Sequence, residues 1–300
     1  MPRHFITLLD FTKEEILDLL LTAKQLKLAW DNEAMLPKLK NKRFALIWDT
    51  EGFRNRVAFE LGITVMGGTY VQIPGQLDQR ESIEDVSLYL SDWFDAIIAR
   101  TRSHDHMLRL TKQNIIPVIN ARTNYNHPCE ILGDLQYILT KHDRLDGLKV
   151  AFIGETTNLC ISWFEAAARL PIKVVQVCPN EYMISKQSFS QLSKNAIGDL
   201  STSNDLELSI KNVDVLYTDC WPSHNNDNSG HIRDLFIPYQ ITADRIKKLC
   251  PNVIFLPCPP VTRGEEVSID AMEIYGRYVY EAKENLLHAQ NALLITLLKK

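Results

Sequence analysis

The stretch Trp48-Asp-Thr-Glu-Gly-Phe-Arg-Asn-Arg-Val-Ala-Phe-Glu60 joins a short apolar run to an amphipathic one. Residues 43–48 are predicted to form a buried strand, and residues 57–62 the start of a helix. Arg54 and Arg56 then lie on the turn where the strand leads into the helix. Unpaired backbone N–H groups and the positive end of the helix dipole meet at such a turn, and two guanidinium groups add to them. The stretch therefore predicts a site for phosphate or carboxylate, with a pair of solvated surface arginines as the alternative.

The rest of the chain repeats the order strand, polar loop, helix. This alternation predicts an α/β fold of two domains, each a parallel sheet flanked by helices. We expect the first domain to span residues 1–140, completed by a C-terminal helix at 280–300, and the second to span 148–275. The predicted strands are residues 43–48, 69–73, 96–99 and 115–120 in the first domain, and 149–154, 173–178, 214–219 and 253–256 in the second.

The composition is that of an ordinary globular chain of 300 residues, 45% hydrophobic and 23% charged, with a formal net charge of -4. The negative charge argues against nucleic acid as a partner, and no apolar run is long enough to span a bilayer. The first residues lack the apolar core of a signal peptide, and the six cysteines never form a Cys-x-x-Cys pair. We therefore expect a cytoplasmic protein with free thiols, no disulfide framework and no metal site.

Polar side chains follow several of the predicted strands. Ligands of open parallel sheets bind beyond the carboxyl ends of the strands, so these side chains are candidates for a binding site. The segment Gly154-Glu-Thr-Thr-Asn158 lacks the glycine pattern of a dinucleotide site, and no Walker motif is present. The candidates are Arg54, Arg56, Arg100, His127, Asn158, Asp219 with Ser223, and Cys258 with Arg263.

Five segments in a fixed order carry a resemblance to a known family. Gly52-Phe-Arg-Asn-Arg-Val-Ala-Phe-Glu60 is similar to a phosphate motif that begins Ser-Thr-Arg-Thr-Arg, and His127-Pro-Cys-Glu130 to His-Pro-Cys-Gln. Residues 214–223 are similar to Asp-Val-x-Tyr-Thr-Asp-x-Trp-x-Ser, and residues 257–267 to His-Cys-Leu-Pro followed by Arg-Gly-x-Glu-Val. Residues 284–294 are similar to the family's closing helix. Over nearly its whole length the chain resembles the aspartate/ornithine carbamoyltransferase family, closest to the ornithine branch.

That resemblance implies transfer of a carbamoyl group from carbamoyl phosphate to an amino acid, without a metal or organic cofactor. It implies an active site between the two domains, and a homotrimer in which Gln76 reaches a neighbouring subunit. Catalysis needs neutralisation of the phosphate, donors for the developing oxyanion and a neutral amine. By the resemblance, Arg54, Arg56 and Arg100 serve the phosphate, Arg54, Arg100 and His127 the carbonyl oxygen, and Asp219 and Cys258 the side-chain amine. Arg263 joins the catalytic set, and Asn158, Asp219, Ser223 and His224 hold the amino acid.

The family's motifs are altered where they carry the chemistry. Gly52, Phe53 and Asn55 stand where the phosphate motif has Ser, Thr and Thr, so hydroxyl donors are lost. Glu130 replaces a glutamine expected near the carbamoyl nitrogen, and its charge repels a nearby phosphate. Pro257 replaces a histidine, and His224-Asn225 replaces the Met-Gly that closes over ornithine in the family.

Several candidates also have purely structural interpretations. Asp219 is a potential helix N-cap, Cys258 a small buried hydrophobe, His127 a turn histidine and Glu130 a first-turn acid that favours the helix dipole. Three hypotheses follow for the whole chain. The first is a working carbamoyltransferase with ornithine or a related diamino acid as acceptor. The second is a relative with an amidine-like donor, which Glu130 would suit, and the third is a non-catalytic relative that binds an amino acid or a protein.

Overall fold

The computed structural model describes residues 1–74, 76–222 and 229–299, and the chain divides into two compact units. The first unit contains Met1–Lys141 with Lys283–Lys300, and the second contains His142–Ala282. Each unit is built on one parallel sheet, as the alternation of strands and helices predicted. No helix in these described ranges is long and apolar enough to cross a membrane.

The sheet of the first unit has the strand order β2-β1-β3-β4. Its two central strands are fully buried over the apolar runs Phe44 to Ile47 and Ala96 to Ala99, which is typical of parallel strands covered on both faces. The strands are β1 (Arg43–Trp48), β2 (Thr69–Ile73), β3 (Ala96–Arg100) and β4 (Val118–Arg122).

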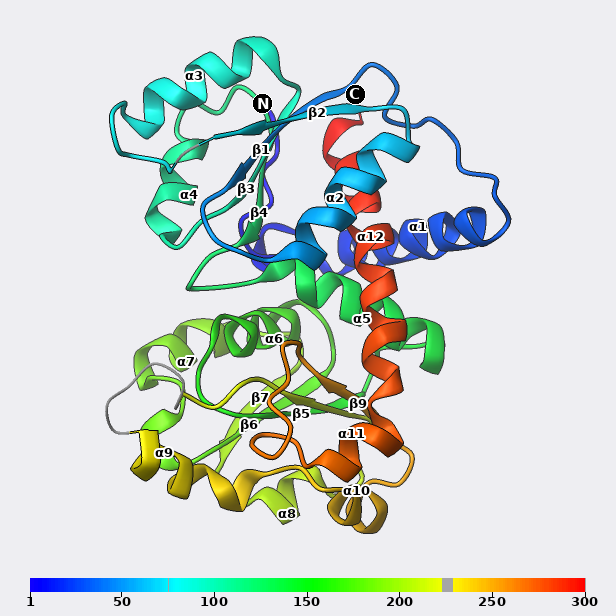
Figure 1. The fold of residues 1–300 in the computed structure, drawn as a ribbon, viewed down its shortest axis with the longest axis vertical. Coiled ribbons are helices and arrows are strands. Elements are labelled where there is room, and N and C mark those ends of the chain that lie inside the picture. The colour runs from blue at the N-terminus through cyan, green and yellow to red at the C-terminus, as the bar shows by residue number, and fades with distance from the viewer. Residues whose placement is uncertain (75, 223–228, 300) are drawn as a thin grey trace. The chain divides into compact units, whose positions relative to one another are not determined.

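Helices cover both faces of this sheet (Figure 1), with α3 and α4 on one side and α2 and α12 on the other. A capping box is present at the first helix, where Thr12 accepts a bond from the Glu15 N–H and Glu15 accepts one from the Thr12 N–H. The helices are α1 (Lys13–Asp31), α2 (Phe53–Val65), α3 (Ile83–Trp93), α4 (His104–Thr111), α5 (Pro128–His142) and the C-terminal α12 (Arg277–Leu298).

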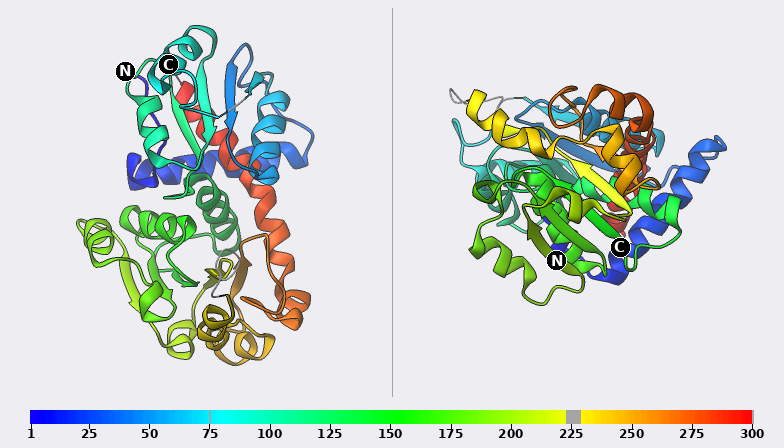
Figure 2. Two further views of the ribbon diagram at one scale, coloured as in Figure 1. Left: turned by 60° about the vertical axis from the view of Figure 1, so that its left-hand side comes forward. Right: turned by 90° about the horizontal axis from the view of Figure 1, so that it is seen from below.

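The sheet of the second unit has the order β7-β6-β5-β8-β9, again with parallel pairs. Helices α6 and α7 lie on one side of it, and α8, α10 and α11 on the other (Figure 2). The strands are β5 (Lys149–Ile153), β6 (Lys173–Val177), β7 (Asp199–Ser203), β8 (Val215–Thr218) and β9 (Ile254–Pro257). The helices are α6 (Asn158–Arg169), α7 (Lys186–Ser193), α8 (Leu206–Ile210), α9 (Ser229–Phe236), α10 (Ala243–Leu249) and α11 (Ile269–Tyr275).

Three sequence predictions about elements were wrong. Strand β7 was missed, because Asp199-Leu-Ser-Thr-Ser203 is a half-exposed edge strand without an apolar signal. Strand β4 begins at Val118 and ends at Arg122, later at both ends than the predicted 115–120. Helix α2 begins at Phe53 and not at residue 57, so Arg54 and Arg56 lie in its first turn.

Both strand orders contain a switch point, where successive connections leave in opposite directions along the sheet. In the first unit it lies between β1 and β3, and in the second between β5 and β8. Ligands of doubly wound sheets bind at such points, beyond the carboxyl ends of the strands. The side chains that follow these four strands therefore lie where a ligand would bind.

Candidate functional site

The turn after β1 is shaped around the side chain of Arg100, the last residue of β3. Its Nε donates to Thr50 Oγ1 at 3.1 Å, and the Asp49 N–H donates to the Arg100 carbonyl oxygen at 2.9 Å. A Cβ at Gly52 would lie 2.4 Å from Arg100 Cζ. The guanidinium therefore occupies the space that a side chain at position 52 would need.

The strand itself helps to aim Arg100. The pairing between β3 and β4 shifts register between Ala99 and Arg100, so that Arg100 lies opposite Arg122. Such irregularities redirect side chains and occur often beside active sites. Two arginines thus end adjacent strands at the same edge of the sheet.

The two arginines of helix α2 have different surroundings. The Arg54 guanidinium lies over the Phe53 ring, with Cζ 4.9 Å from the ring centroid, and it lowers the pKa of Glu130 through its charge. Arg56 Nε donates to Glu60 Oε1 at 2.7 Å, within the same helix. Arg54 is therefore directed to the neighbourhood of Glu130, whereas Arg56 forms an ion pair along the helix surface.

Asn55 is buried between these arginines, with 3% of its surface exposed. Its Nδ2 donates to the Ala121 carbonyl oxygen at 3.3 Å, which ties α2 to the end of β4. Among the described residues its Oδ1 has no hydrogen-bond partner. The side chain that replaces a family threonine thus joins two elements of the scaffold.

The loop between β4 and α5 is held by a buried network of asparagines. Asn120 Nδ2 donates to Asn126 Oδ1 at 2.7 Å and to the Ile6 carbonyl oxygen at 2.8 Å. Thr123 N–H donates to the Asn126 carbonyl oxygen at 2.9 Å. These bonds fix the residue that follows, His127, directly before the helix starts at Pro128.

His127 and Glu130 are both buried, with His127 Nε2 3.5 Å from Glu130 Oε2. Burial lowers the pKa of His127 to about 3. The charge of Glu130 raises this pKa, whereas the positive charges of Arg100, Arg122 and Lys283 lower it. His127 is therefore neutral at physiological pH.

Glu130 is held by Lys283 of helix α12. Lys283 Nζ lies 2.6 Å from Glu130 Oε1 and 2.8 Å from Asp134 Oδ1, and all three side chains are at least nine-tenths buried. Burial alone would raise the pKa of Glu130, but Lys283, His127 and Arg54 outweigh it and hold that pKa below its ordinary value. Glu130 is thus a carboxylate with a buried ammonium as its counter-ion.

Sequence reasoning missed two members of this cluster, Lys283 and Arg122. Arg122 ends β4, so the rule that selected Arg100 would also have selected it once the strand was bounded correctly. Lys283 gives no such signal, because it is one of many charged residues in the amphipathic C-terminal helix.

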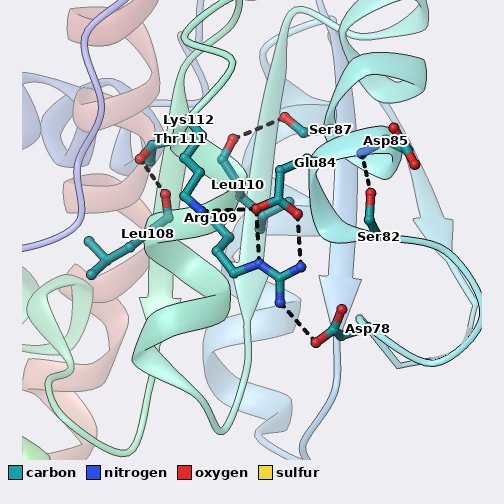
Figure 3. Close-up of polar contacts among 10 residues, drawn as sticks. All are labelled: Asp78, Ser82, Glu84, Asp85, Ser87, Leu108, Arg109, Leu110, Thr111 and Lys112. Atoms are coloured by element: carbon teal, nitrogen blue, oxygen red, sulfur yellow. Dashed lines mark hydrogen bonds and ion pairs between the residues drawn. The ribbon is translucent and has the colours of Figure 1, made fainter.

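The loop before α3, which carries Gln76, is anchored by Arg109 of helix α4 (Figure 3). Arg109 Nη1 lies 2.8 Å from Asp78 Oδ2, and Nη2 lies 2.8 Å from Glu84 Oε2. Gln76 is exposed, and its Oε1 accepts a bond from Gln79 Nε2 at 2.9 Å. The loop is therefore fastened at Asp78 while Gln76 stays at the surface.

In the second unit, the loop after β5 is held by the buried amide of Gln176. Gln176 Nε2 donates to the Gly154 carbonyl oxygen and to Thr156 Oγ1, both at 3.1 Å. Thr157 caps helix α6 by accepting a bond from the Cys160 N–H, so Asn158 is the first residue of that helix. Gly154 has a φ of 145°, and a Cβ built on it would lie 3.8 Å from the Asp219 carbonyl oxygen.

Asp219 follows β8 on the other side of the switch point. Its Oδ1 accepts a bond from the Cys220 N–H at 2.9 Å. Burial and the charge of Asp219 raise the pKa of Glu155, and burial raises the pKa of Glu266 to about 7, with Asp219 and Glu265 adding to it. Asp219 is thus part of a group of carboxylates, a setting that favours a cation.

The remaining candidates of the second unit lie after β9. Cys258 is buried, and its N–H donates to the Thr218 carbonyl oxygen at 2.8 Å, which places it beside the end of β8. Arg263 is exposed on the following loop. Pro257 ends β9. Ser223 and His224 lie outside the described residues.

No group of three or more His, Cys, Asp and Glu side chains suited to a metal ion occurs in the part of the chain described. The six cysteines are free thiols. Burial raises the pKa of Cys178 and Cys220 to about 12 and that of Cys250 to about 11, so these thiols are protonated at neutral pH.

Arg54, Arg100 and His127 therefore lie at the switch point of the first sheet, and Asn158, Asp219 and Cys258 at that of the second. Residues 3–140 match the family model of the aspartate/ornithine carbamoyltransferase carbamoyl-P binding domain, and residues 146–297 match that of the Asp/Orn binding domain. The chain belongs to the aspartate/ornithine carbamoyltransferase family.

The relatives and the structural neighbour named here are ornithine carbamoyltransferases. The chain is 35% identical to an ornithine carbamoyltransferase of Chlorobaculum tepidum, covering 95% of this chain and 85% of that protein. It is 32% identical to the Methanosarcina acetivorans ornithine carbamoyltransferase over the full length of both. The Pyrococcus furiosus ornithine carbamoyltransferase structure matches with a TM-score of 0.92, 32% identity and coverage of 98% of this chain and 96% of that one.

Proposed function

We propose that this chain transfers the carbamoyl group of carbamoyl phosphate to the side-chain amine of ornithine. The observation that carries the proposal is the cluster of Arg54, Arg100 and a neutral His127 at the switch point of the first sheet. Two guanidinium groups suit a phosphate dianion. A neutral imidazole can donate a hydrogen bond, and it carries no positive charge that would compete with the guanidinium groups for the phosphate. The relatives named ornithine carbamoyltransferase support the same reaction.

In the proposed division of labour, residues 1–140 with 280–300 bind the donor. Arg54 and Arg100 neutralise the phosphate, and His127 donates to the carbonyl oxygen as negative charge develops there. Gly52, Phe53 and Asn55 shape the turn, and Arg56 orients the first turn of α2 through Glu60. Glu130 accepts from the carbamoyl nitrogen.

Residues 148–275 bind the amino acid. Asp219, with Glu155 and Glu266 near it, attracts a cationic amino acid, and Cys258 lies beside the same strand end. Asp219 and Cys258 bring the side-chain amine to its neutral form. Asn158, Ser223 and His224 hold the rest of the amino acid, and Arg263 is the last member of the catalytic set. The amine nitrogen then attacks the carbamoyl carbon, the C–O bond to phosphate breaks with its electrons leaving on phosphate, and the departing phosphate takes the proton that the nitrogen loses.

The alternative amidine-like donor required a free carboxylate at position 130. Glu130 already has a cationic partner in Lys283, with Nζ 2.6 Å from Oε1, so a cationic donor is not needed there. This contact favours carbamoyl phosphate.

For the assembled enzyme we propose a cytoplasmic homotrimer in which Gln76, exposed on its anchored loop, serves a neighbouring subunit.

A colorimetric citrulline assay with a panel of amino acids tests the proposal. With excess carbamoyl phosphate, ornithine should be converted to citrulline at a rate far above the rate at which lysine, aspartate or 2,4-diaminobutyrate is carbamoylated. If no amine in the panel gives a carbamoylated product, the chain is a non-catalytic relative. A product from another amine alone would keep carbamoyl transfer but reject ornithine as the acceptor.

A further inference from the structure

Lys283 contacts a proposed site residue, yet it lies in the C-terminal helix, far along the chain from the other members of that cluster. Its ammonium is 2.6 Å from Glu130 Oε1 and 2.8 Å from Asp134 Oδ1. The side chain is 10% exposed, and those of Glu130 and Asp134 are 7% and 1% exposed. A buried ion pair of this kind is costly to break, because removal of one partner leaves an uncompensated charge in a poorly solvated place.

The charge at position 130 explains why such a lysine is needed. The family motif has a neutral glutamine where this chain has Glu130, and a bare carboxylate there would repel the phosphate of the donor. The ammonium of Lys283 offsets part of that charge, since it is shared between Glu130 and Asp134. It also holds Oε1, which leaves Oε2 facing His127 at 3.5 Å.

The backbone of α5 is adapted to bring this lysine close. A Cβ at Gly133 would lie 2.9 Å from Leu286 Cα, so only a glycine lets α12 approach α5 at this point. Lys283 lies one helical turn before Leu286 and therefore reaches Glu130 and Asp134 from the adjacent turn.

We propose that Lys283 is a positioning residue for carbamoyl transfer, which acts through Glu130 by offsetting its charge and fixing its orientation beside His127. The ion pair of Glu130 and Lys283 then does the work of the neutral glutamine in the family motif. This inference rests on the proposed function, because it assumes that Glu130 borders the donor.

A set of five variants tests the inference: K283M, E130Q, E130Q/K283M, D134N/K283M and the control K27M. Lys27 also pairs with a residue of α12, Glu284, at 3.0 Å, but away from Glu130. Steady-state citrulline formation gives kcat and the KM for carbamoyl phosphate, and thermal unfolding reports stability separately.

K283M should raise the KM for carbamoyl phosphate by ~100-fold, the scale set by breaking a buried charge pair, while K27M leaves it unchanged. E130Q/K283M should return that KM to within ~10-fold of E130Q, because the charge that needed cancelling is gone. D134N/K283M should recover thermal stability without recovering the KM. An unchanged KM in K283M, or equal recovery by the two double variants, would overturn the inference, since Lys283 would then have only a structural role.

The same set separates this inference from the proposed function. If the unmodified protein forms no citrulline but binds inorganic phosphate in calorimetry, the proposed function fails. The phosphate affinities of the variants are then compared in place of KM. Recovery of phosphate affinity in E130Q/K283M and not in D134N/K283M would keep the assignment of Lys283, and the reverse pattern would reject it.

Discussion

Gly52 leaves a gap that the guanidinium of Arg100 fills, with Cζ 2.4 Å from the place of a Cβ. The residue that replaces the family serine therefore removes a hydroxyl donor and at the same time lets an arginine approach the turn. A close guanidinium is a stronger partner for phosphate than a hydroxyl group, because its hydrogen bonds are charge-assisted. We expect this approach to offset the loss of hydroxyl donors in the motif.

G52A should displace Arg100 and weaken donor binding. We expect the KM for carbamoyl phosphate to rise by ~10-fold, the value of about one charged hydrogen bond. G230A is the matched control, since a Cβ at Gly230 meets nothing within 4 Å. Kinetics of both variants check this prediction, and an unchanged KM in G52A would show that the gap has no function.

Glu266 is a buried carboxylate whose Oε1 accepts a hydrogen bond from the Thr262 N–H at 2.6 Å. Burial raises its pKa from 4.5 to about 7. The folded protein holds this proton more tightly than the unfolded chain, so the stabilisation is complete below pH 4.5 and is lost as the pH rises through 7.

The E266Q substitution should therefore stabilise the protein more at pH 8 than at pH 5. The difference between the two effects on the free energy of unfolding should be up to ~3 kcal/mol. Urea unfolding at the two pH values measures this difference. Equal differences between the two proteins at both pH values would show that Glu266 titrates normally.

At the scale of elements, the approach of α12 to α5 depends on Gly133. The distance of 2.9 Å from a Cβ to Leu286 Cα involves backbone, which cannot move aside as a flexible side chain would. The same approach carries Lys283 to Glu130.

G133A should separate the two helices, with a loss of ~1–3 kcal/mol in stability and a higher KM for carbamoyl phosphate. In G230A, on an exposed helix, the same change should be neutral or slightly stabilising. Thermal unfolding and kinetics of the pair check this. A G133A protein as stable and active as G230A would contradict the close packing of α5 on α12.

The elements also show what sequence reasoning reaches and where it stops. Apolar runs such as those of β1 and β5 fixed the parallel sheets, because a strand covered on both faces must be apolar throughout. Strand β7 lacks that requirement at the edge of its sheet and was missed. Arg54, Arg100 and His127 were predicted from their positions after strands, but the ion pair of Glu130 with Lys283 joins residues distant in sequence, which no local pattern reveals.

At the scale of the whole molecule, several buried histidines make the fold sensitive to acid. Burial lowers the pKa of His127 to about 3 and that of His288 to about 4, below the ordinary 6.5. The unfolded chain then binds more protons than the folded one in this range. Their contribution to stability is complete above pH 6.5 and is lost as the pH falls through 4 and 3.

H288F should flatten the acid limb of the stability curve. His288 packs against Trp30 with ring centroids 5.9 Å apart, so an aromatic ring without a titrating nitrogen suits the place. We expect the loss of unfolding free energy between pH 6.5 and pH 4 to shrink by up to ~3 kcal/mol. Urea unfolding across this range measures it, and a curve parallel to that of the unmodified protein would contradict the prediction.

Binding of the donor by Arg54, Arg100 and neutral His127 is the claim on which the account depends, and calorimetric titration with carbamoyl phosphate tests it most directly. The unmodified protein should bind with a saturable isotherm, and R100M should bind at least ~100-fold more weakly, since it loses charged hydrogen bonds to the phosphate. Equal affinities in the two proteins, or no binding by the unmodified one, would contradict the account.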